Sequence, residues 1–261
     1  MPGDRPTIDL NADVGEAGDV AGTAVERALL ALVTSAHIAC GGHAGNAATM
    51  RATVQSALAA GVQVGAHPSY PDRAGFGRVA MELSPGELSA SLTAQLAALI
   101  EIAHALGTTV SSVKPHGALY GEVARGGTSC DVLLGVMGEL CDPGTALVLP
   151  SGAPAGLRAQ EASWAVLQEG FCDRAYTADG ALVARYEPGA VYDDPARAAA
   201  QARGLAEDGT VHAVDGAVLS LAVDTLCVHG DSPNAVPMAR AVRAALEAAG
   251  VTVAAPMTRQ P

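Results

Sequence analysis

The stretch IDLNADVGE, residues 8–16, alternates apolar and polar side chains from Ile8 to Asp13. This alternation predicts a β-strand, because successive side chains of a strand point to opposite faces. One face carries only apolar side chains: Ile8, Leu10 and Ala12. The other carries only polar ones: Asp9, Asn11 and Asp13. A buried carboxylate is costly unless it is paired or bound. We therefore predict that these polar side chains line the interior of a β-barrel and belong to a functional site. The alternatives are a solvated edge strand and a single structural ion pair.

Short β-type runs recur along the chain and alternate with helical segments. We predict seven strands, at residues 7–13, 34–40, 62–67, 110–116, 145–150, 164–170 and 221–228. We predict seven helices, near residues 20–32, 46–60, 84–106, 127–140, 153–162, 194–207 and 234–249. Ser84, Pro85 and Glu87 give the third helix a capping box with proline at its first position. This alternation predicts parallel strands with right-handed crossovers, as a closed barrel or a doubly wound sheet.

Polar motifs follow nearly every predicted strand, and this distribution favours the barrel. In a doubly wound sheet, functional residues gather at one switch point; in a barrel they come from the carboxyl ends of many strands. The fold predicted is therefore α/β, a TIM-like (β/α) barrel with seven strands. The segment 176–220 is long for a connection, and we expect a small hairpin in it before the helix at 194–207.

The amino-acid composition limits the classes of protein to which the chain can belong. The 261 residues are 49% hydrophobic and 16% charged, without a linker or a repeat, which predicts a single globular domain over residues 1–261. A net charge of −12 argues against a nucleic-acid partner. No signal peptide or membrane span is expected, so the predicted location is cytoplasmic. Five widely spaced cysteines are typical of reduced, buried thiols.

Five of the seven histidines fall at predicted strand ends: His37, His43, His67, His116 and His229. Lys114 lies between Val113 and Pro115 at another strand end, and lysine is rarely buried without a partner. Asp13, Asp173, Arg174 and Asp231 complete the polar set at this rim. Each alone is as compatible with a structural role, but together they predict an active site.

Metal binding is the first mechanism to consider. His37, Cys40 and His43 have the spacing of ligands, but strand parity places Cys40 opposite His37. A site of Asp13, His43 and His67 from different strands stays open, with N and O ligands suited to Zn, Mn or Fe. We predict no tightly bound metal.

Nucleotide binding is the second mechanism. The chain has neither a P-loop nor a dinucleotide-binding glycine motif. The glycine-rich turns CGGHAGN (40–46) and DRAGFGR (72–78) nevertheless offer backbone N–H groups, and a helix begins near Asn46. Arg73 and Arg78 add cations suited to phosphate or carboxylate.

Taken in order, six motifs resemble those of the LamB/YcsF family: IDLNADVGE, SAHIACGGHAG, GAHPSYPDRAGFGR, VKPHGALY, EGFCDRAYTADGALVAR and DTLCVHGDSP. The resemblance runs from about residue 8 to about residue 236. It implies a seven-stranded barrel of the glycoside hydrolase/deacetylase type. It also implies the role of the A subunit in an ATP-dependent 5-oxoprolinase, which hydrolyses 5-oxo-L-proline to L-glutamate with partner subunits B and C and with ATP, together with Mg, as co-substrate.

Residue roles follow from the motifs and the resemblance together. The candidates for catalysis are Asp13, His43, His67, Lys114, His116, Asp173 and His229. The candidates for binding substrate or nucleotide are Asn11, Arg73, Arg78, Arg174 and Asp231. Two other functions stay open: a metal-dependent deacetylase or amidohydrolase that works without ATP, and a non-catalytic subunit that binds a lactam or a sugar.

The chain departs from the family pattern at the end of its second predicted strand. His37 stands where the family usually has Asn, Gly42 where it has a bulky aromatic residue, and Asn46 where it has Asp. These changes alter charge and shape at one strand end, so this stretch is the first to examine in the structure.

Overall fold

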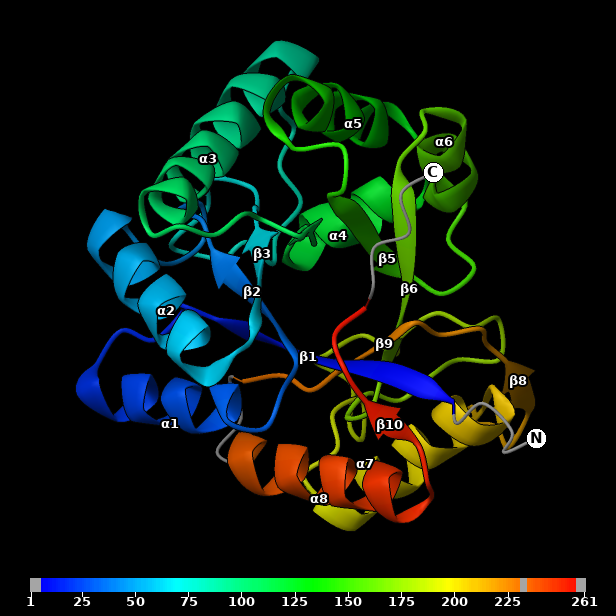
Figure 1. Cartoon of the computed structure of the whole chain (residues 1–261). Helices are drawn as coiled ribbons and strands as arrows, with labels where there is room; N and C mark the ends of the chain where they lie inside the picture. Colours follow the sequence, from blue (N-terminus) through cyan, green and yellow to red (C-terminus); the bar gives the residue numbers. More distant parts are fainter. Residues whose placement is uncertain (1–5, 231–233, 257–261) are drawn as a thin grey trace, which may run out of the picture.

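Seven parallel strands close into a barrel in the computed structural model, which describes residues 6–230 and 234–256 (Figure 1). They are β1 (Thr7–Val14), β2 (Ser35–Ala39), β3 (Gln63–His67), β4 (Ser112–Val113), β5 (Ala146–Pro150), β6 (Ala165–Phe171) and β9 (Thr225–Cys227). Each pairs with the next, and β9 pairs back onto β1, with Leu10 opposite Leu226. The predicted seven-stranded barrel is confirmed.

Helices surround the strands (Figure 1). They are α1 (Val20–Leu30), α2 (Ala47–Ala60), α3 (Pro85–Ala105), α4 (Gly117–Ala124), α5 (Thr128–Leu140), α6 (Ala155–Glu161), α7 (Pro195–Arg203), which continues as a π-helix over Gly204–Asp208, and α8 (Ala235–Ala248). Among the described residues, α3 alone is long and apolar enough to cross a membrane. Its apolar side packs inside the protein, with Leu92 and Leu96 fully buried against neighbouring elements. This helix is therefore an amphipathic helix of the outer layer, with one side packed inside the protein.

The local signals that define the helix ends act as the sequence predicts. The Ser84 side chain accepts from the Glu87 backbone N–H, and the Glu87 side chain accepts in return from the Ser84 N–H. Asn46 caps α2 through its side chain, and Gly61 ends that helix in the left-handed region with a φ of 70°. These groups satisfy backbone donors and acceptors that a helix terminus leaves without partners.

Four predictions about elements were wrong in detail. Helix α4 was missed, because Gly117 and Gly121 lower its helix propensity and it follows β4 directly. Strand β4 is much shorter than the predicted 110–116, since Pro115 lacks the N–H that would extend the pairing. A small hairpin turn precedes α7, as predicted, with Tyr176 and Leu182 in an antiparallel bridge. The two-stranded sheet of β7 (Thr210–His212) and β8 (Val218–Ser220), which follows that helix, was not predicted. A short strand, β10 (Thr252–Val253), pairs with the beginning of β1 and was not predicted.

The two faces of β1 separate as its alternation predicts. Leu10 and Ala12 are fully buried in the apolar core between barrel and helices. Asp9, Asn11 and Asp13 are also buried, but they bond to polar groups of neighbouring strands and to the Lys114 ammonium that follows β4. The polar row is neither an exposed edge nor one isolated ion pair, because several strands contribute partners to it.

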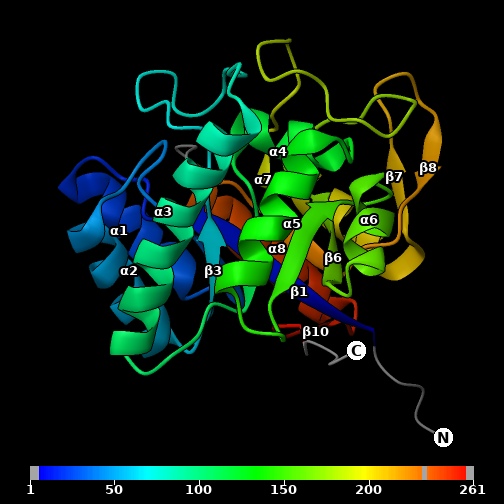
Figure 2. The ribbon, with the colours of Figure 1, turned by 90° about the horizontal axis from the view of Figure 1, so that it is seen from above.

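The loops that follow β3 and β6 project on the same side of the barrel (Figure 2). In a parallel barrel, this is the side on which the carboxyl ends of all strands meet. It is also the side on which the polar motifs gather.

Candidate active site

A cavity of about 540 Å³ opens at the carboxyl ends of the strands. Its volume is in the range typical of small-molecule sites. Most of the predicted site residues line it: Asp13, His67, Arg78, Lys114, His116, Arg174 and His229. Glu16, Tyr120, Phe171 and Arg185 line it as well. The structure thus brings together side chains from β1, β3, β6 and the segments after β4 and β9.

Lys114 lies at the floor of this cavity and is 3% exposed. Its Nζ is 2.9 Å from Asp13 Oδ1 and 2.8 Å from Glu169 Oε1. It also donates to Asn11 Oδ1 at 3.2 Å and to Cys227 Sγ at 3.3 Å. Because an ammonium has three donors, these contacts occupy the group fully. Lys114 therefore fixes the two carboxylates and is not placed to hold a phosphate.

The charges around Lys114 determine the ionisation of its partners. Burial would raise the pKa of Asp13, but the charges of His67 and Lys114 hold that pKa well below its ordinary value. Burial would lower the pKa of Lys114, but Asp13 and Glu169 raise it well above its ordinary value. Both groups are therefore charged at neutral pH. Tyr120 donates to the other oxygen of Glu169 at 2.6 Å, and its own pKa is raised by burial and by that carboxylate.

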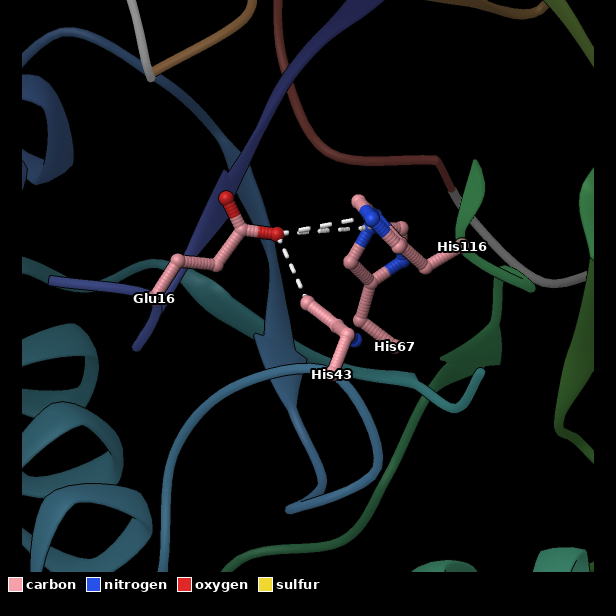
Figure 3. A group of neighbouring side chains, drawn as sticks. All are labelled: Glu16, His43, His67 and His116. Atoms are coloured by element: carbon pink, nitrogen blue, oxygen red, sulfur yellow. Dashed lines mark hydrogen bonds and ion pairs between the residues drawn. The ribbon is translucent and has the colours of Figure 1, made fainter. Parts of the chain in front are cut away.

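Three imidazole rings, those of His43, His67 and His116, surround the carboxylate of Glu16 (Figure 3). His43 Nε2 is 2.9 Å, His116 Nδ1 3.6 Å and His67 Nε2 3.9 Å from Glu16 Oε1. His43 and His116 stack with their ring centroids 3.8 Å apart. Burial lowers the pKa of His43 to about 3 and that of His116 to about 2, so both are neutral. Burial would also lower the pKa of His67, but the Asp13 carboxylate raises it overall.

Beyond the ends of β6 and β9, Asp173 and His229 form a second pair. Asp173 accepts from the His229 backbone N–H at 2.9 Å, and its Oδ1 is 2.9 Å from His229 Nδ1. Burial would raise the pKa of Asp173, but the charge and hydrogen bonds of His229 lower it overall. The His229 ring stacks on Phe171, with centroids 5.7 Å apart. A carboxylate that holds Nδ1 orients an imidazole so that Nε2 can take a proton.

The predicted arginines differ in whether they line the cavity. Arg78 lines the cavity, as does Arg185, which was not predicted. Arg174 lines it too, but its guanidinium donates to the carbonyls of Ala190 and Val183 and so holds the loop after β6. Arg73 does not line the cavity; it donates to the carbonyls of Gly41 and Gly45, which fixes the loop before α2. The predicted Asp231 lies outside the described residues.

The departures from the family pattern at β2 have structural partners. His37 Nε2 is 3.1 Å from Ser112 Oγ, and its ring fits because Gly65 beside it has no Cβ. A Cβ on Gly42 would lie 2.5 Å from Gln95 Oε1, so Gln95 occupies the space that a larger side chain would need. Cys40 donates to the Ile38 carbonyl, and burial raises its pKa to about 12. This inert thiol agrees with the rejection of a ligand set of His37, Cys40 and His43.

The sequence analysis did not predict five residues of the site: Glu16, Tyr120, Glu169, Phe171 and Arg185. Glu16 and Glu169 lie within motifs at strand ends, so their position was a usable signal. Glu169 was hidden because β6 begins with the apolar Ala165, Val166 and Leu167, which do not alternate with polar residues. Tyr120 could not be found, since the helix α4 that carries it was missed.

Comparison with known proteins extends over nearly the whole chain. The profile of the LamB/YcsF family matches residues 8–260. Over 247 residues the chain is 46% identical to the Paracidovorax citrulli protein named as the A subunit of 5-oxoprolinase, covering 94% of this chain and 98% of that protein. The Methylococcus capsulatus protein of the same name is 46% identical over 249 residues, or 95% of each chain. The crystal structure of a lactam utilization protein from Thermus thermophilus superposes with a TM-score of 0.87 at 41% identity, covering 96% of this chain and 100% of that one.

Proposed function

Because this chain belongs to the LamB/YcsF family, we propose that it acts as the A subunit of a 5-oxoprolinase. In this role it hydrolyses 5-oxo-L-proline to L-glutamate, coupled to ATP hydrolysis, together with partner subunits B and C. The observation that carries the proposal is the charged cavity at the barrel mouth, in a chain that matches proteins of that name almost end to end.

The route of the reaction determines which groups the site must provide. In the route we propose, ATP transfers its γ-phosphoryl group to the lactam oxygen, and water then attacks the activated ring carbon. The carbon–nitrogen bond breaks and the nitrogen takes a proton, which leaves an acyl phosphate. A second water then displaces phosphate from that carbon and completes the side-chain carboxylate of glutamate. Such a site needs cations for the phosphates, a base for the water and donors for the oxyanion.

His229 is the group best placed to take the proton from water. Asp173 holds its Nδ1, and the ring borders the cavity. The fixed Asp13–Lys114–Glu169 network keeps charged groups at the cavity floor, where they orient the bound substrate. Arg78 and Arg185 border the same space and are the candidates for the phosphates and for the substrate carboxylate.

One reconstitution tests the proposal. The chain is mixed with the B and C subunits, 5-oxo-L-proline and ATP with Mg²⁺, and glutamate and ADP are measured, with each component left out in turn. We expect equal amounts of both products in the complete mixture only. If the complete mixture forms no glutamate, the proposal is wrong. If the chain binds the lactam but the mixture shows no turnover, the chain has a non-catalytic role in binding.

The roles of individual residues are tested in the same mixture. His229→Gln should lower kcat by about 10²- to 10⁴-fold, the range for loss of a general base. The exposed His212, in the hairpin away from the cavity, provides a matched control in His212→Gln. Equal turnover of the two variants would show that His229 is not the general base.

The cluster of Glu16 and three histidines favours one second candidate, a metal-dependent amidohydrolase or deacetylase that works without ATP. This function requires the chain alone to release glutamate from 5-oxo-L-proline, or acetate from an acetylated sugar, with loss of activity on chelation. The mixtures that lack ATP and the partner subunits distinguish it from the main proposal.

A further inference from the structure

We propose that Glu16, His67 and His116 bind one divalent transition-metal ion of the zinc class, with His43 positioning the Glu16 carboxylate. This inference concerns ion binding and does not depend on the proposed function. Two imidazoles and one carboxylate are a common ligand set of catalytic zinc sites, in which water or substrate takes the fourth position.

The distances between the three ligand atoms fit one small ion. His67 Nε2 and His116 Nδ1 are 3.0 Å apart, and Glu16 Oε1 is 3.9 Å and 3.6 Å from them. A tetrahedral ion with bonds of about 2.0–2.1 Å holds its ligand atoms about 3.3–3.4 Å apart. The measured separations bracket this value, so small side-chain rotations would complete the site.

Backbone carbonyls fix the orientation of both imidazoles. His67 Nδ1 is 2.7 Å from the Lys114 carbonyl, and His116 Nε2 is 2.9 Å from the Phe76 carbonyl. Each ring must donate at that nitrogen, because a carbonyl only accepts. The two remaining nitrogens then face each other with lone pairs, which is unfavourable unless a cation or an additional proton lies between them. In metal-binding histidines, the ring nitrogen that does not bind the metal usually donates to a carbonyl or carboxylate, as both of these rings do.

The loop between β3 and α3 holds this geometry. Phe76 has a φ of 54°, a left-handed conformation that is costly for a residue with a large side chain. In this conformation its carbonyl reaches His116. Gly77 follows with a φ of 64°, and a Cβ there would lie 3.0 Å from both the His116 ring and the His43 Cβ. The strained turn and the close approach thus hold the imidazoles in place.

His43 contributes to the proposed metal site by holding the Glu16 carboxylate and not by binding the ion. Its Nε2 lies 2.9 Å from Glu16 Oε1, whereas its Nδ1 is buried without a hydrogen-bond partner among the described residues. A ligand histidine would have a partner at that second nitrogen. We therefore assign His43 the role of a positioning residue that holds the carboxylate in line.

A rival group of possible ligands, Asp13, Cys227 and His229, does not fit a cation. The Lys114 ammonium already lies 2.9 Å from Asp13 Oδ1 and 3.3 Å from Cys227 Sγ. A divalent ion there would meet a buried positive charge at close range. The ion therefore belongs on the Glu16 side of Asp13, where it borders the cavity and would polarise a bound water or carbonyl oxygen.

Metal binding by the complete chain tests the proposal. Tag-free protein is stripped with a chelator, and Zn²⁺ and Co²⁺ are titrated separately by calorimetry and by visible absorption. We expect one ion per chain and a Co²⁺ spectrum without a thiolate charge-transfer band. Absence of stoichiometric binding, or a thiolate band that disappears in Cys227→Ser, would overturn the assignment.

Variants distinguish ligands from the positioning residue. Glu16→Gln and His116→Asn should each weaken Zn²⁺ binding by more than about 100-fold, beyond the usual effect of an outer partner. His43→Asn should weaken it by about 10- to 100-fold. The half-exposed His104 on α3 gives a matched control, and His104→Asn should bind as the unchanged chain does.

Circular dichroism and thermal melts of every metal-free variant show that the fold is intact, so a lost site is not confused with an unfolded chain. If folded Glu16→Gln and His116→Asn proteins both bind Zn²⁺ as tightly as the control, the facing nitrogens share a proton instead and the metal site is refuted.

Discussion

Lys114 illustrates how one residue can hold together charges from several strands. Its ammonium contacts Asp13 of β1 and Glu169 of β6, two strands that β9 separates in the barrel wall. All three side chains are buried, so removing the cation would leave two buried carboxylates without the positive charge that they share. The sequence identified Lys114 as unusual from its apolar neighbours, but it could not identify Glu169, far along the chain, as its partner.

Replacing this cation should be strongly destabilising. We expect Lys114→Met to lower the free energy of unfolding by about 3–5 kcal/mol, measured by urea denaturation at pH 7. The matched control is Arg203→Met, which breaks an exposed pair with Glu207 and should cost less than about 1 kcal/mol. Equal losses in the two variants would show that the buried network contributes no more than a surface pair.

The Asp173–His229 pair should give stability a specific pH dependence. The pKa of Asp173 is lowered in the folded protein, mainly through His229 against the opposing effect of burial. A lowered folded-state pKa stabilises above the unfolded-state pKa of about 3.9, and this contribution is lost as the pH falls through the folded-state value.

Urea denaturation of Asp173→Asn between pH 6 and pH 2.5 tests this expectation. The variant should be less stable than the unchanged chain at pH 6, and the difference should shrink as the pH falls below about 4. A difference that stays constant over the whole range would contradict the charged state of Asp173.

At the scale of elements, helix ends were more predictable than strand lengths. Ser84, Pro85 and Glu87 form the predicted capping box, because all its partners lie within four residues. Strand β4 contains only Ser112 and Val113, since its length depends on neighbours distant in sequence. Local hydrogen bonds can be read from local sequence, whereas pairing depends on the partner strand.

Removing the cap should destabilise α3. We expect Ser84→Ala to lower the free energy of unfolding by about 1 kcal/mol, since the Glu87 N–H loses its acceptor and the Glu87 carboxylate loses one of its two donors at residue 84. Ser56→Ala within α2 is the matched control, because its hydroxyl only bonds back to the Ala52 carbonyl and should contribute almost nothing. Thermal melts of both variants measure the difference; a larger effect at Ser56 would be inconsistent with the capping role.

For the whole molecule, closure of the barrel brings the first and last strands of the sheet together. Thr225 of β9 donates to Asp9 and accepts from Asn11 Nδ2, so one hydroxyl joins two polar residues of β1 across the closing seam. These contacts span more than 200 residues of sequence. No local pattern could predict them.

Loss of this hydroxyl should weaken the seam. We expect Thr225→Val to destabilise the protein by about 1–3 kcal/mol, because buried polar groups of Asp9 and Asn11 lose a partner. Hydrogen exchange should accelerate in β1 and β9 more than in β5. Thr225→Ser keeps the hydroxyl and should retain the protection of the seam; uniform acceleration in all strands would contradict a local role.

The sequence by itself determined the alternation of strands and helices, the polar inner face of β1, the helix caps and the rim on which the site lies. These features depend on residues adjacent in the chain, or on which side of a strand a residue faces. Only the tertiary structure decided that Glu16 meets His43, His67 and His116, that Lys114 is committed to Asp13 and Glu169, and that Arg73 supports a loop away from the cavity. Barrel closure sets these distances, because it fixes how far each strand end stands from the others, and sequence spacing carries no information about that separation.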